Sequence, residues 1–168
     1  MNFPMQLDNA LNWLQATAVA RAISEDEILF PWIESVHVLA IVLVVGTITI
    51  VDLRLLGVAS LNRAVGRLMR DVLPLTWGAF VVAAITGSLL FSSNARTYAH
   101  NIFFQGKLVL LTLAGLNMAI FHVVGIRDID RWGASRQTPF AAKAAGAVSL
   151  LVWVAVIACG RWIGFTVH

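Results

Sequence analysis

The sequence predicts an all-α, multi-pass membrane protein built as a bundle of four transmembrane helices. Hydrophobic residues make up 59% of the chain and charged residues 12%, whereas soluble domains have about 45–50% and about 25%. Four apolar stretches also reach the ~20 residues that a helix needs to cross a bilayer; they lie near 32–53, 72–92, 102–124 and 140–162. Residues 1–168 are therefore expected to form a single membrane domain.

The residues before the first span are expected to include a short helix over 6–24 at the membrane interface. Leu7, Leu11 and Leu14 recur at helical spacing, while Asp8 lies on the other face. Such an amphipathic helix lies along the surface of a bilayer rather than across it.

Capping and helix-breaking residues mark the start of the first span. Ser24 followed by Glu27 resembles a capping box, and Pro31 is expected to begin or kink the helix. The first ten residues lack the basic and apolar regions of a signal peptide, so the first span is expected to direct insertion.

Basic residues in the short loops predict the orientation. They cluster around the first and third loops, as Arg54, Arg63, Arg67 and Arg70, and as Arg127, Arg131, Arg136 and Lys143. Cytoplasmic loops carry an excess of Lys and Arg, so both termini are predicted on the outer side. The basic balance, 12 residues against 9 acidic ones, is explained by these loops. No nucleic-acid motif accompanies it, and we expect no nucleic-acid partner.

Ionisable residues inside the predicted spans fall on two helical stripes. These are Glu34, His37 and Asp52 in the first span, and His100, Lys107 and His122 in the third. Ionisable groups at membrane depth are costly and usually face a bundle interior, a cavity or a cofactor. One interpretation is structural pairing in a non-redox scaffold, with Glu34 bound to Lys107 and Asp52 bound to His122 or Arg54.

A second interpretation is haem. Imidazole is a common axial ligand of haem iron, and helical bundles build cofactor sites from facing helices. The levels of His37 and His122 differ by roughly 14 residues, or about 20 Å, so one iron cannot bind both. They are predicted to hold separate b-type haems, up to two per chain, and His100 joins the outer one only if the second loop folds inward.

Other side chains are assigned supporting roles around these haems. Lys107 lies at the outer level, where it can neutralise Glu34 or a haem propionate, and Arg54 can do the same at the inner level. Trp77 lies near the level of His122, where it can stack on a porphyrin. Small residues, including Thr86 and Gly87, thin the second span and leave room for a flat ligand or for close helix packing.

A third interpretation is a copper or iron ion without porphyrin. Glu34 and His37 have the i, i+3 spacing by which helical bundles present carboxylate and imidazole to iron. His100 would supply a third ligand near the outer surface. Cys159 is the only cysteine, so an intrachain disulfide and a paired-cysteine zinc site are excluded.

Three segments carry a resemblance to a known group: FPWIESVHVLAIVLVVGTITIVDLRLLG, TGSLLFSSNARTYAHNIFFQGKLVLL and LNMAIFH. They resemble a family of small, uncharacterised four-helix bacterial inner-membrane proteins, distantly similar to copper-resistance D-type bundles and four-helix b-type cytochromes. The family-like residues are Glu34, His37, Asp52, Arg54, Lys107, Asn117 and His122. The resemblance implies a bacterial inner-membrane protein that binds haem and forms a homo-oligomer, and with the loop charges this places both termini in the periplasm.

Together these observations favour a haem-binding b-type cytochrome that transfers electrons within the bilayer, exchanging them with quinone or a redox partner protein. The alternatives are copper or iron handling and a non-redox scaffold. Nothing in the sequence identifies a substrate, so membrane oxidoreductase activity is left open. A chain of four spans has little room to enclose a porphyrin alone, which favours a homo-oligomer, a trimer before a dimer.

Overall fold

The computed structural model describes residues 5–121, 123 and 138–166, and within these ranges it is helical without strands. The helices are α1 (Met5–Gln15), α2 (Ala18–Glu25), α3 (Leu29–Leu56), α4 (Val65–Ser93), α5 (Ala95–His100), α6 (Ile102–Ile120) and α8 (Phe140–Thr166). Helices α3, α4, α6 and α8 are long and apolar enough to cross a membrane. The predicted fold class is confirmed, and the chain is a multi-pass membrane protein.

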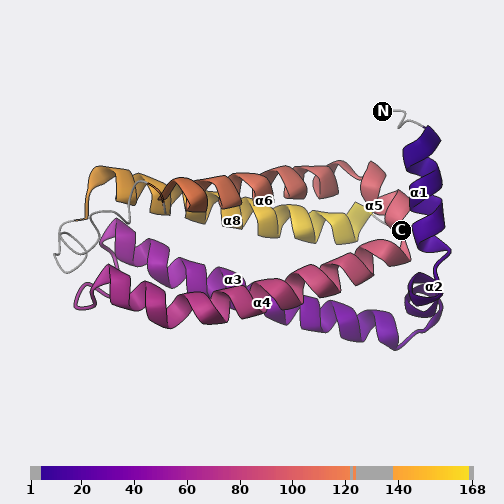
Figure 1. The fold of residues 1–168 in the computed structure, drawn as a ribbon, viewed down its shortest axis with the longest axis horizontal. Coiled ribbons are helices and arrows are strands. Elements are labelled where there is room, and N and C mark those ends of the chain that lie inside the picture. Colours follow the sequence, from indigo (N-terminus) through magenta and orange to yellow (C-terminus); the bar gives the residue numbers. More distant parts are fainter. Residues whose placement is uncertain (1–4, 122, 124–137, 167–168) are drawn as a thin grey trace.

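The four long helices run side by side, and α1 and α2 lie across one end of them (Figure 1). Helix α3 packs along α4, α6 packs along α8, and the two pairs meet where α3 contacts α8. Helices α1 and α2 contact the ends of α3, α4 and α5. Helix α1 and the end of α8 lie at this end of the bundle (Figure 1), which we call the terminal end; the opposite end is the loop end.

The single N-terminal helix predicted over 6–24 is instead two helices. Thr17 has extended backbone angles, and its hydroxyl oxygen accepts a hydrogen bond from the backbone N–H of Ala20 at 3.3 Å. A threonine in this conformation is an N-cap, so it ends α1 and begins α2. Leu11 and Ile23 are buried, 7% and 2% exposed, so part of the apolar surface of both helices packs on the protein itself.

The predicted Ser24–Glu27 capping box is wrong, because the neighbouring Asp26 makes the cap. Its Oδ1 accepts from the backbone N–H groups of Ile28 at 2.8 Å and Leu29 at 3.0 Å. These two bonds hold the pKa of Asp26 below its ordinary value, because they favour the charged carboxylate. The Ser24 hydroxyl donates to the Arg21 carbonyl within α2.

The α3–α4 connection is closed by a buried arginine. Arg54 is 0% exposed, and its Nε donates to the backbone carbonyl of Arg63 at 2.9 Å. Gly57 ends α3 with φ of +79°, a left-handed conformation that glycine adopts without steric cost. Arg54 is therefore part of the loop closure, and its predicted pair with Asp52 is not formed.

The third span begins at Ile102, so His100 lies before it. His100 lies in the separate helix α5, and Asn101 caps α6 by accepting from the backbone N–H groups of Phe103 at 2.9 Å and Phe104 at 3.3 Å. The prediction that His100 shares a helical stripe with Lys107 is therefore wrong. His122, on the same predicted stripe, lies outside the described residues.

Candidate functional site

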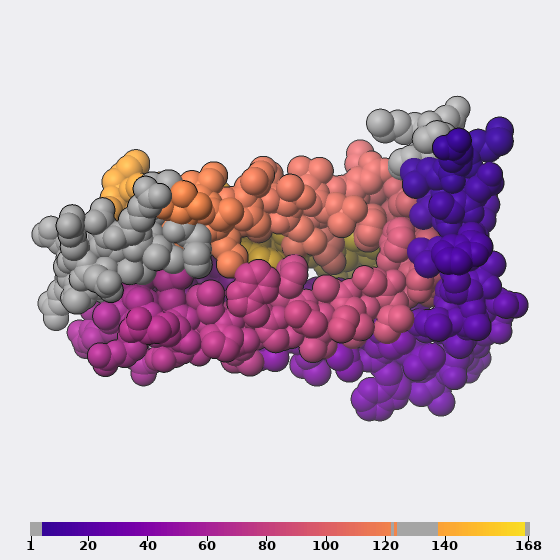
Figure 2. All heavy atoms as spheres, in the orientation of Figure 1, coloured from indigo at the N-terminus to yellow at the C-terminus, as the bar shows by residue number. Residues whose placement is uncertain are grey.

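The bundle is open between α4 and α6. These two helices do not pack along each other, although each packs closely on another long helix. Figure 2 shows the surface hollowed between them, with α8 visible at the bottom of the hollow. We call this hollow the α4–α6 seam. Both groups of polar side chains described below lie in the interior of the bundle, which is open along the α4–α6 seam.

His37 lies toward the terminal end of the bundle, where it projects from α3 against α4. Its Nδ1 is 3.0 Å from the hydroxyl oxygen of Thr86. A Cβ built on Gly87 would lie 2.8 Å from Cε1 of the imidazole, closer than real carbon atoms approach. The glycine is therefore required for the close approach of the ring to the backbone of α4.

The contact with Thr86 orients the imidazole of His37. A hydroxyl has one proton, and the Val82 carbonyl lies 2.7 Å from the Thr86 oxygen. When Thr86 donates to Val82, its oxygen accepts from Nδ1–H of His37. In that tautomer the lone pair is on Nε2, which is the form in which a histidine held by a neighbouring acceptor binds a metal.

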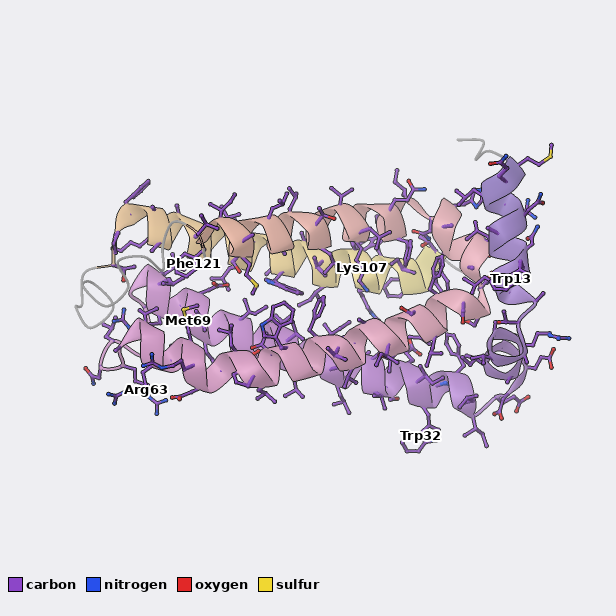
Figure 3. All side chains as sticks on the ribbon, in the orientation of Figure 1. Trp13, Trp32, Arg63, Met69, Lys107 and Phe121 are labelled. Atoms are coloured by element: carbon purple, nitrogen blue, oxygen red, sulfur yellow. The ribbon has the colours of Figure 1, made fainter. Side chains whose placement is uncertain are left out.

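Lys107 projects from α6 into the interior of the bundle (Figure 3). Its ammonium nitrogen lies close to Gly160 of α8, 3.8 Å from where a Cβ there would stand. Its charge acts on the imidazole of His37 and interacts with the thiol of Cys159. The interior at this level therefore contains an imidazole and an amine, both potential ligands or anion partners.

Glu34 does not join them. Its side chain is exposed, and its negative charge acts on Tyr98 in α5, whose pKa is raised by burial and then by this charge. No ion pair joins Glu34 to Lys107 in the described residues. The predicted Glu34–Lys107 pair is therefore wrong, because the terminal end of α3 diverges from α6 (Figure 1).

The predicted metal-ion site of Glu34, His37 and His100 is not assembled either. Nδ1 of His100 lies 2.8 Å from the Arg96 carbonyl, and its Nε2 is 3.8 Å from a carboxylate oxygen of Asp8. His100 thus ties α5 to α1. Among the described residues, no group of three histidine, cysteine or acidic side chains is placed to hold a metal ion.

A cavity of about 250 Å³ occupies the half of the bundle nearer the loop end. All four spanning helices line it. Most of its wall is apolar, with Trp77, Phe80 and Trp153 as the aromatic members, and Met69 and Phe121 lie toward the loop end of it (Figure 3). We call this space the inner cavity.

Asp52 supplies the charge-bearing group of the inner cavity. The residue is 5% exposed, and its Oδ2 has no hydrogen-bond partner. Ser149 of α8 lines the cavity beside the carboxyl group. No lysine, arginine or histidine lines the cavity among the residues that the structure describes.

The remaining polar side chains offer the cavity mainly acceptors. The Thr76 hydroxyl is 2.8 Å from the oxygen of Thr47, whose own proton points to the Leu43 carbonyl. The proton of Thr76 is thus directed away from the cavity. Asn117 donates one amide hydrogen to the Ala145 carbonyl at 3.1 Å, and its side-chain oxygen is an acceptor.

The two levels differ in how well they fit a haem. The imidazole of His37 lies against Thr86 and Gly87 of α4, and Lys107 offers a positive charge for a propionate. The inner cavity is smaller than the roughly 300–1,000 Å³ of pockets for drug-sized ligands, and a porphyrin is larger than such ligands. Trp77 lines this cavity, and its stacking on a porphyrin stays a prediction.

A family model described as a family of unknown function matches residues 12–166. The chain belongs to the DUF6644 family. This match agrees with the resemblance to an uncharacterised family and shows no link to b-type cytochromes or copper-resistance bundles. No curated protein and no solved structure matches this DUF6644 member.

Two residues of these sites went unrecognised as functional partners in the sequence. Thr86 was noted only as a small residue of the second span, although its spacing from Val82 is the i−4 position to which a helical hydroxyl donates. Ser149 carries no signal of its own in an apolar helix. Its importance follows only from the contact of α8 with α3.

Proposed function

We propose that this DUF6644 protein is a b-type haem protein of the membrane, with the haem in the α4–α6 seam and His37 as an axial ligand. The observation that carries the proposal is the contact of Nδ1 of His37 with the Thr86 hydroxyl, which would hold the imidazole so that Nε2 can bind the iron. A bound haem supplies one-electron chemistry. Quinone or a redox partner protein would exchange these electrons.

The residues around His37 have complementary roles in this proposal. Thr86 orients the imidazole, and such outer partners usually contribute tenfold to a hundredfold in affinity. Gly87 allows the ring to approach α4. Lys107 would pair with a propionate, which would place a negative charge beside an amine that has no acidic partner among the described residues.

The second predicted haem, on His122, remains a prediction that rests on the sequence alone. Its ligand lies outside the described residues. We therefore expect at least one haem per chain, at the His37 level.

The proposal is tested by the visible spectrum and haem-to-protein ratio of protein purified after expression with a haem precursor. We expect a Soret band that His37→Ala abolishes and that the matched control His100→Ala retains. Thr86→Val, which keeps the shape of the side chain but removes the hydroxyl, should weaken haem binding roughly tenfold or more. Full haem content in His37→Ala, or metal without porphyrin in the wild-type protein, would contradict the proposal.

We further propose that the protein lies in a bacterial inner membrane with both termini in the periplasm. The arginines of the first and third loops support this orientation. Reporter fusions after Arg67 and after Arg131 are expected to read cytoplasmic, and fusions at either terminus to read periplasmic. A periplasmic signal from either loop would reverse the orientation.

A homo-oligomer, a trimer before a dimer, completes the proposal. Helix α6 has no buried residue within the chain, which supports a neighbour or a ligand on this side. Mass measurement in mild detergent tests this, and a monomer at all protein concentrations would contradict it.

A further inference from the structure

The inner cavity presents an unbalanced set of polar groups. Asp52 is only 5% exposed, and one oxygen of its carboxyl group has no hydrogen-bond partner. A buried, unpaired carboxylate costs several kcal/mol or more, and membrane proteins usually pair such groups or use them. The described chain provides no cation beside it.

The side chains next to Asp52 also favour a ligand that donates hydrogen bonds. The proton of Thr76 is directed toward Thr47, and Asn117 keeps its oxygen available while one of its hydrogens is bound to Ala145. A ligand that donates hydrogen bonds therefore meets more free partners here than a ligand that accepts them. The unpartnered oxygen of Asp52 is the strongest of these acceptors because it can carry a full charge.

The wall of the cavity indicates what the rest of the ligand is like. Trp77 and Phe80 are in edge-to-face contact, with centroids 5.8 Å apart, and Trp153 adds a third aromatic side chain. Aromatic faces attract organic cations. A bare metal ion would leave most of a 250 Å³ apolar space unfilled, whereas an amine with an apolar body would fill it.

We propose that the inner cavity binds a small organic cation, an ammonium group on a compact apolar body, with the Asp52 carboxylate as its counter-charge. Asn117 and Ser149 border the ammonium, and the aromatic side chains surround the apolar body. The hollow of the α4–α6 seam is the path by which such a ligand enters (Figure 2). This site does not depend on the proposed haem, because none of these residues contacts His37.

The test is calorimetric titration of the purified full-length protein in lipid nanodiscs at neutral pH. The probe is 2-phenylethylammonium, and its neutral counterparts are 2-phenylethanol and acetophenone. We expect saturable binding of the ammonium and roughly tenfold to a hundredfold weaker binding of the alcohol, the size of a charged hydrogen bond. Asp52→Asn should weaken binding of the ammonium by a similar factor. The control Asp71→Asn, on the exposed surface of α4, should leave this affinity unchanged.

A second variant keeps the test decisive if Asp52→Asn does not fold. Gly115 lines the cavity, and a Cβ there meets no atom within 4 Å, so Gly115→Leu should fold and occupy the space. It should abolish ammonium binding while Asp52 is intact. The proposal is overturned if the alcohol or the ketone binds as well as the ammonium, if sodium ions alone produce an Asp52-dependent signal, if Gly115→Leu binds normally, or if the wild-type protein binds no ammonium.

Discussion

Helices α3 and α6 are both apolar spans of one bundle, but the chain surrounds them differently. Six residues of α3 are buried, including Val44, Asp52 and Leu55, because α3 packs against both α4 and α8. No residue of α6 is buried, since it packs along α8 and is open toward α4. Helix α3 is thus a central element and α6 an edge, and both candidate sites lie on the side where α6 is open.

The difference teaches where function can be placed in a small membrane bundle. A helix that neighbours enclose is fixed by packing, whereas an edge helix has surface left for lipid, a ligand or a second copy of the chain. His37 and Asp52 project from the central helix, and the space beside them is bounded by the edge helix. The central helix α3 therefore holds these side chains in place, and the edge helix α6 forms a wall that can adapt to a ligand.

The largest difference between α3 and α6 is expected when a leucine side chain is placed against each helix. A Cβ on Gly146 would lie 3.1 Å from the Asp52 carbonyl oxygen and 3.2 Å from Cβ of Leu55, so Gly146→Leu forces α8 away from α3. Overpacking of this kind costs about 1–3 kcal/mol. Gly115→Leu on α6 meets open space and should gain up to about 1 kcal/mol from helix propensity. Unfolding in mild detergent measures both, and equal losses would show that α6 is as enclosed as α3.

A smaller effect is expected from the hydrogen bond that anchors the edge helix. Asn117→Ala removes the bond to the Ala145 carbonyl, and hydrogen bonds between membrane helices contribute about 0.6 kcal/mol on average. We expect faster amide hydrogen exchange in α6 and unchanged exchange in α3. Thr76→Val, which removes the hydroxyl bond between α4 and α3, is the matched control, because packing should hold α3 without it. Equal loosening of α3 in that control would contradict the comparison.

The smallest effect is expected at the start of the central helix. Asp26 caps α3 and has a lowered pKa in the folded state. The carboxylate therefore contributes stability above its ordinary pKa of 3.8, and this contribution is lost as the pH falls through the folded pKa. The melting temperature of Asp26→Ala should lie below that of the wild type at pH 7, and the gap should narrow below about pH 4. Asp26→Asn keeps a hydrogen-bond acceptor, so its melting temperature should fall less than that of Asp26→Ala. A difference in melting temperature between Asp26→Ala and the wild type that is independent of pH would exclude a charged Asp26 cap.

The fold could be predicted from the sequence because apolar length is a property of each span alone. The depth of Asp52 and its inward direction also follow from helical periodicity. The direction of Glu34 could not be predicted, since periodicity gives the angle between side chains on one helix but not where that helix diverges from its neighbours. His100 was misplaced because Asn101, an ordinary polar residue in the sequence, begins a new helix.

The partners of the candidate sites were the least predictable part. Thr86 and Ser149 act through contacts between helices that are far apart along the chain, and a single sequence contains no information on which residues meet. The predicted pairs Glu34–Lys107 and Asp52–Arg54 failed for the same reason. Opposite charges at the same depth were assumed to meet, but Arg54 turns back to its own loop.

The buried Arg54 has a consequence for the order of assembly in the cell. Its bond to the Arg63 carbonyl joins residues nine positions apart, so it can form as soon as α3, the loop and the start of α4 have been synthesised. We therefore expect the first helical hairpin to close before α6 and α8 leave the ribosome. The second pair of helices must dock onto this finished unit through α8, and α6 arrives on the outside of it.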